Sequence, residues 1–141
     1  MKEFHLAVTR LDCRKVLSML RDLARSMSDT VDSRTDNMVN WRDGSLRTAT
    51  MLLARRPSSD CRCRSHVRRS MLDVLRDAGA QLDLVDDDGN TALMHAVLSS
   101  SEDVVDWLLE AGVDAKIANH VGVTPLWQVI HVNRQNCIGR R

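Results

Sequence analysis

Two cysteines and one histidine form the only arrangement in this sequence whose types and spacing could hold a metal ion. They occur as Cys61-x-Cys63-x-x-His66. Zinc takes about four ligands in a tetrahedron and accepts thiolate and imidazole. The segment supplies three, so a fourth would have to come from Cys13, His5 or His120. Because that ligand is missing, we favour a cysteine-containing surface loop and expect no cofactor. The zinc hypothesis predicts about one ion per chain, lost in Cys61→Ser.

A dense group of arginines surrounds these cysteines, with Asp60 as its only acid. Six guanidinium groups could contact phosphates and support salt-sensitive nucleic-acid binding, or equally a phosphorylated peptide or an acidic protein. No aromatic residue interleaves with them, so a platform for stacking bases is absent. We therefore favour a solvated, self-repelling insertion over a nucleic-acid site. The members of this basic patch are Arg55, Arg56, Arg62, Arg64, Arg68 and Arg69.

Three consecutive acids, Asp86, Asp87 and Asp88, suggest a calcium loop at first sight. An EF-hand would also need an acid two positions before Asp86 and a glutamate at the last loop position. Leu84 and His95 occupy those places. The acids therefore indicate a turn with surplus charge at its exposed tip.

Motifs of catalysis and of export are missing from the sequence. It contains no Gly-rich phosphate loop, no H-E-x-x-H and no nucleophile elbow, so we expect no enzymatic activity. No apolar run reaches the roughly 18 residues of a membrane span, and Met1–His5 lacks the apolar block of a signal peptide. The four cysteines are scattered, which predicts reduced thiols and an intracellular protein, either cytoplasmic or nuclear.

The net charge of +1 conceals two halves of opposite sign. Residues 1–70 hold 15 Lys and Arg against 8 Asp and Glu, whereas residues 71–141 hold 5 against 11. Since electrostatic fields act locally, the +7 and −6 balances matter more for binding than the total does.

The elements that must position these residues follow a repeat. Gly89 and Gly122 are 33 residues apart, as are Thr91 and Thr124, and D-A-G-A at 77–80 recurs as E-A-G-V at 110–113. A fixed period of matching residues indicates a repeat array. The segments G-x-T-A-L-M-H-A from Gly89 and G-x-T-P-L-W from Gly122 resemble the ankyrin motif G-x-T-P-L-H-x-A. The run V-V-x-x-L-L-x-x-G at 104–112 resembles the second helix of the same family.

The resemblance implies an all-α solenoid of helical hairpins with short β-turn loops, in about 3.5–4 repeats. We expect one domain over 1–141: an atypical first repeat at 1–27, a loop at 28–40, a second repeat at 41–88, a third at 89–121 and an incomplete fourth at 122–141. The step from Thr48 to Thr91 is ten residues longer than the period, which predicts an insertion near 57–66. Ser70 is the expected cap of the helix that follows. Either 129–138 caps the fourth repeat or, as we favour, the chain is a fragment of a longer array.

In this family the concave side and the loop tips bind other proteins. Carried over by position, the contact candidates are Asp86, Asp87, Asp88, His95, Asn119, His120 and Gln128. This surface is acidic in the third repeat, so the expected partner is a protein with a basic patch. Trp107 and Trp127 could be exposed anchors, but their helical phase favours packing between repeats. A protein-binding scaffold is therefore the preferred function, and nucleic-acid or phosphate binding through 55–69 is the alternative.

Overall fold

Helices make up most of the residues that the structure describes. The structure is a computed structural model that describes residues 3, 6, 7, 10, 13–26, 39–56 and 65–138. None of the helices in these residues is long and apolar enough to span a membrane. The helices with defined bounds are α2 Cys13–Ser26, α4 Ala49–Ala54, α5 Ser65–Asp77, α6 Ala92–Leu98, α7 Glu102–Glu110 and α8 Pro125–Ile138.

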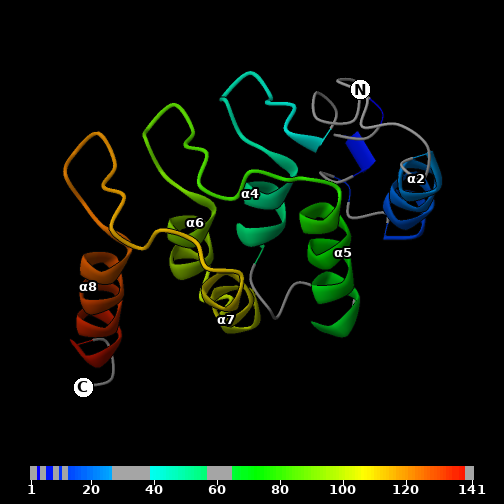
Figure 1. Ribbon diagram of the computed structural model, residues 1–141. Helices are drawn as coiled ribbons and strands as arrows, with labels where there is room; N and C mark the ends of the chain where they lie inside the picture. Colours follow the sequence, from blue (N-terminus) through cyan, green and yellow to red (C-terminus); the bar gives the residue numbers. More distant parts are fainter. Residues whose placement is uncertain are drawn as a thin grey trace.

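These helices stack in two rows (Figure 1). The first helix of each repeat contacts the next one, α4 against α6 and α6 against α8, while α2, α5 and α7 form the second row. Within a repeat α4 packs on α5 and α6 on α7. Three loops project from the same side of the stack (Figure 1), and the described residues contain no strand beyond a bridge between Val85 and Thr91. The predicted all-α repeat solenoid is therefore confirmed.

A threonine precedes each of the helices α4, α6 and α8. The side-chain oxygen of Thr48 accepts the N–H of Met51, and Thr91 and Thr124 do the same three residues downstream. This cap satisfies one of the backbone donors that a helix start leaves without an intrahelical partner. Because the same cap precedes α4, α6 and α8, Thr48, Thr91 and Thr124 occupy equivalent positions of their repeats.

A glycine follows the second helices α5 and α7. Gly79 has φ of 84° and Gly112 has φ of 79°, a region that residues with a Cβ disfavour. The following residue donates its N–H back to the helix, Ala80 to Leu75 and Val113 to Leu108. This bonding is a Schellman motif, and it turns the chain sharply towards the next repeat.

The core lies between the two rows. Its largest fully buried side chains come from α4, α5, α6 and α7, and burying each one contributes about 1.5–3 kcal/mol. They include Met51, Leu53, Met71, Leu72, Leu75, Met94, Trp107 and Leu108. Each hairpin leaves an apolar side that only its neighbour covers, so the stability of one repeat depends on the next.

Ser70 does not cap α5, contrary to the sequence prediction. The helix already begins at Ser65, and the Ser70 hydroxyl donates to the carbonyl of His66 from inside the helix. Since α5 therefore includes 65 and 66, it takes up the end of the predicted insertion. Residues 57–64 of that insertion, and most of the predicted loop at 28–40, lie outside the described residues. The proposed repeat boundaries stay predictions.

Candidate interaction surface

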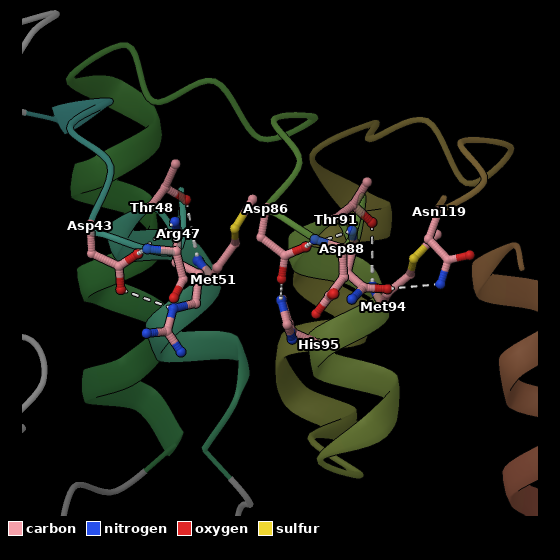
Figure 2. A network of polar contacts seen from close by, with 12 residues as sticks. Asp43, Arg47, Thr48, Met51, Asp86, Asp88, Thr91, Met94, His95 and Asn119 are labelled. Atoms are coloured by element: carbon pink, nitrogen blue, oxygen red, sulfur yellow. Dashed lines mark hydrogen bonds and ion pairs between the residues drawn. The ribbon is translucent and has the colours of Figure 1, made fainter. Parts of the chain in front are cut away.

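Three loops of the same construction project from the stack. In each, a side-chain oxygen of the first residue accepts the backbone N–H groups two and four positions downstream, at 2.8–3.1 Å. Figure 2 shows the first residues at equivalent places before α4, α6 and α8. A short Asp or Asn side chain is suited to this bonding, which replaces a backbone partner inside the turn. The three residues are Asp43, Asp86 and Asn119.

The remaining atom of each of these side chains finds a different partner. Asp43 pairs with Arg47 at 2.9 Å within its own loop. Asp86 bonds the Nε2 of His95 at 2.7 Å, which ties the loop to α6 (Figure 2). Asn119 donates to the side-chain oxygen of Asn90 at 3.0 Å, in the preceding loop. The second loop is thereby fixed to α6 and the third loop to the second, whereas the Asp43 contact stabilises the first loop internally.

Burial and the nearest charged group shift the pKa of His95 in opposite directions, and the same holds for the pKa of Asp43. Burial lowers the pKa of His95, and the neighbouring Asp86 carboxylate only partly offsets that effect. Burial raises the pKa of Asp43, but backbone N–H groups of Arg47 and Ser45 and the Arg47 charge outweigh it, so that pKa lies below 3.8. His95 is therefore neutral near pH 7, in the tautomer whose Nε2–H donates to Asp86.

Neighbouring loops are bonded edge to edge. The N–H of Asp87 donates to the carbonyl of Ser45 at 3.3 Å, and the N–H of His120 donates to the carbonyl of Asp88 at 3.1 Å. The two bonds join equivalent positions of successive loops. Gly89 permits this approach, since a Cβ there would lie 2.8 Å from the backbone nitrogen of His120. The loop tips thus form one continuous ridge.

The predicted contact residues divide into three groups by exposure. Asp87, Asp88 and His120 are exposed and adjacent on the ridge. Asp86 and His95 are buried against each other, so they support the ridge and are not free to meet a partner. Asn119 and Gln128 are half-buried. The Oε1 atom of Gln128 is buried without a hydrogen-bond partner among the described residues.

The predicted basic patch is not one exposed surface. Arg68 is 3% exposed, pairs with Asp103 at 3.4 Å and donates to the carbonyl of Arg56, because α5 turns it towards α7. Arg69 pairs with Glu110. Arg55 is exposed, whereas Arg62 and Arg64 lie outside the described residues, as do Cys61 and Cys63 of the zinc hypothesis.

The two tryptophans differ, although both were expected to pack between repeats. Trp107 is 1% exposed, and its Nε1–H donates to Asp73 at 2.7 Å. Trp127 is 53% exposed and stacks on His131, with ring centroids 5.0 Å apart. Its equivalents Met51 and Met94 are fully buried, whereas the described residues place no further helix over Trp127.

Sequence reasoning missed the residues that join one loop to the next. Ser45 and Asn90 do so through a carbonyl and a side-chain oxygen. Aligning the loops on Thr48 and Thr91, across the insertion, would have placed Ser45 opposite Asp88 and identified the repeated bond. The turn glycine is absent from the first loop, where Leu46 takes its place with φ of 55°, which obscured the alignment.

Comparisons with known proteins agree with the repeat fold. The model of a family described as ankyrin repeats, in three copies, matches residues 4–139. No curated protein matches the chain. Among solved structures, the crystal structure of the yeast ribosomal protein Rps3 in complex with its chaperone Yar1 contains a similar chain, with a TM-score of 0.70 and 20% identity. The likeness covers 96% of this chain and 85% of that one, and it concerns the fold.

Proposed function

Because the chain belongs to the ankyrin repeat family, we propose that it is a non-catalytic scaffold that binds another protein through its loop ridge and the adjoining concave side. Ankyrin repeats are in general modules of protein–protein interaction. The similar solved chain belongs to a complex of a ribosomal protein with its chaperone, which is compatible with this class of function. An intracellular location is part of the same proposal.

The observation that carries the proposal is the ridge itself. Its loops share one internal bonding pattern and bond to each other, so their tips are held in fixed positions before a partner arrives. A prearranged surface loses little conformational entropy on binding, which improves affinity. Function follows from this surface and not from the fold alone.

The chemistry of the ridge favours a partner with a basic patch. Asp87 and Asp88 expose two carboxylates side by side at the centre of the ridge, with His120 next to them. Since opposite charges steer association over a distance that salt screens, the association rate should fall as ionic strength rises.

The test is capture of partners from a cell extract by the immobilised chain, compared with the double variant Asp87→Asn/Asp88→Asn. Asp86 stays unchanged because it holds the loop together. A matched control removes two exposed carboxylates elsewhere, Asp77→Asn/Glu110→Gln. We expect the ridge variant to lose at least ten-fold in partner recovery, and the control to lose little.

The competing function, nucleic-acid binding through 55–69, has its own arm of the experiment. Arg62→Ser/Arg64→Ser is compared with wild type, and titration with labelled duplex and single strand is done at two salt concentrations. Recovery that depends on the arginines and not on the ridge acids, or salt-sensitive nucleic-acid binding, would replace the scaffold proposal.

A further inference from the structure

A groove of about 430 Å³ runs between α7 and α8. Four valines, Val97, Val105, Val129 and Val132, line it together with Ala96, Ser100 and Ser101. Glu102 and Asp106 of α7 stand at its edge, and both are exposed. The groove therefore combines an apolar stripe with an acidic rim.

The same kind of groove is filled at the earlier steps of the array. Helix α7 lies against both α5 and α6, and α5 lies against both α2 and α4 (Figure 1). In each case a helix of the second row occupies the angle between its predecessor and the first helix of its own repeat. The groove between α7 and α8 occupies the equivalent place one repeat later. Its walls therefore correspond to the surfaces that hold α7 between α5 and α6.

Helix α8 exposes apolar positions whose counterparts in α6 are covered. Val129, which lines the groove, is 37% exposed, whereas Ala96, 33 residues earlier, is 0% exposed. Leu126 and Ile130, on α8 outside the groove lining, are 68% and 61% exposed. Exposed apolar surface that is buried at an equivalent place indicates a surface adapted to contact.

The filled groove shows how its polar edge is used. Asp73 on α5 accepts the Nε1–H of Trp107 on α7, and Asp106 is the counterpart of Asp73 one period later. Arg69 on α5 pairs with Glu110 on α7, but its counterpart at the groove is Glu102. The charge of the groove at this position is therefore positive at Arg69 and negative at Glu102. The groove between α5 and α6 holds the acidic helix α7, whereas the groove between α7 and α8 has an acidic rim.

We propose that the groove between α7 and α8 binds an amphipathic α-helix of a partner protein, with an apolar stripe and a basic flank. The partner helix lies on α8 as α7 lies on α6. Its apolar residues cover the four valines, and Lys or Arg side chains meet Glu102 and Asp106. Apolar burial supplies most of the affinity, and the charges select a basic helix over an acidic one.

The probe is a labelled peptide of residues 100–113, the α7 segment, with Glu102→Lys, Asp103→Lys, Asp106→Lys and Glu110→Lys. The control peptide has the native acids at these positions. Fluorescence anisotropy should show the lysine peptide binding the full chain at least ten-fold more tightly. This preference should shrink as salt rises, and circular dichroism should show that the bound peptide gains helix.

Variants of the full chain locate the binding. Val129→Lys should weaken the lysine peptide at least ten-fold, whereas Val121→Lys, on an exposed loop, should leave it unchanged. Asp106→Lys is exposed and should abolish the preference between peptides without affecting thermal unfolding. Asp87→Asn/Asp88→Asn should not change peptide binding, which separates this site from the ridge.

Three results would overturn the proposal. Equal affinity for both peptides, or binding that Val129→Lys leaves intact in a folded chain, would show that the groove does not select a basic helix. A mass in sedimentation that doubles with concentration and returns to one chain in Val129→Lys would show that a second copy occupies the groove.

Discussion

At the residue scale, three equivalent loop positions adopt a left-handed backbone. Gly89 and Gly122 have φ of 79° and 82°, and Leu46 has φ of 55° at the matching place in the first loop. A residue with a Cβ costs roughly 1–2 kcal/mol in this conformation. Gly89 carries a second constraint, since the next loop lies against it.

This difference predicts an order of stability among three substitutions. Gly122→Ala should lower the free energy of unfolding by about 1 kcal/mol through backbone strain alone. Gly89→Ala should lower it by about 2–3 kcal/mol, because the new Cβ also displaces His120. Leu46→Gly should raise it by up to about 1 kcal/mol. Urea unfolding followed by circular dichroism measures all three.

Gly44→Ala is the control, since Gly44 has no positive φ and its Cβ would meet nothing within 4 Å. Its effect should stay within about 0.5 kcal/mol. Equal losses for Gly89→Ala and Gly122→Ala would contradict the close approach of the loops.

The buried pair of His95 and Asp86 predicts a pH dependence of stability. Because the pKa of His95 is lowered in the folded state, the unfolded chain binds a proton first as the pH falls below 6.5. The free energy of unfolding should therefore decrease from pH 6.5 down to the folded pKa. The lowered pKa of Asp43 adds a further decrease below pH 3.8.

Two variants isolate the imidazole. His95→Gln keeps an N–H donor for Asp86 and cannot titrate, so its stability should be flatter below pH 6.5. His95→Leu leaves a buried carboxylate oxygen without its donor, which should cost about 1–3 kcal/mol at pH 7. If wild type and His95→Gln show the same pH profile in urea titrations, His95 is not the titrating group.

At the scale of elements, the contact between α5 and α7 joins the second and third repeats. Trp107 packs into the core and donates to Asp73, and Arg76 lies over its ring at 5.7 Å. The buried Arg68 adds an ion pair with the half-buried Asp103. The residues of the suspected basic patch thus serve partly to connect helices.

The two tryptophans provide a matched comparison. Trp107→Ala should cost about 3–5 kcal/mol, as expected for a large cavity between packed helices. Trp127→Ala should cost less than about 1 kcal/mol, since the side chain is half exposed on α8. Urea unfolding monitored by circular dichroism tests both, and similar costs would contradict the exposure of Trp127.

At the scale of the whole molecule, the array behaves as a row of units that stabilise their neighbours. Helix α6 is covered by α4, α7 and α8, whereas α8 contacts α6 and exposes Leu126, Trp127 and Ile130. Local opening should therefore be easier in α8 than in α6.

Hydrogen exchange measures this gradient along the chain. Amides of α6 should exchange at least ten-fold more slowly than those of α8 at neutral pH, since a partly covered helix opens at lower free energy. Addition of the lysine peptide should slow exchange in α8 more than in α4. Equal protection of α6 and α8 without peptide would argue against stacking as the source of stability.

The sequence by itself determined the repeat period, the helical hairpins, the threonines that begin helices and the glycines that end them. These features depend on local rules: Thr91 caps a helix wherever one starts, and Gly112 ends it wherever the chain must turn. The acids Asp86, Asp87 and Asp88 were likewise interpreted as a turn.

Only the tertiary structure decided which polar residues are available for binding. Arg68 and His95 look like surface residues in the sequence, yet each is buried against an acid from another element. The exposure of Trp127 and the open groove beside α8 depend on which helix lies next to α8. Burial depends on which neighbouring helices pack against a side chain. A periodic sequence pattern shows which residues are equivalent in successive repeats, but it does not show which of them a neighbour covers.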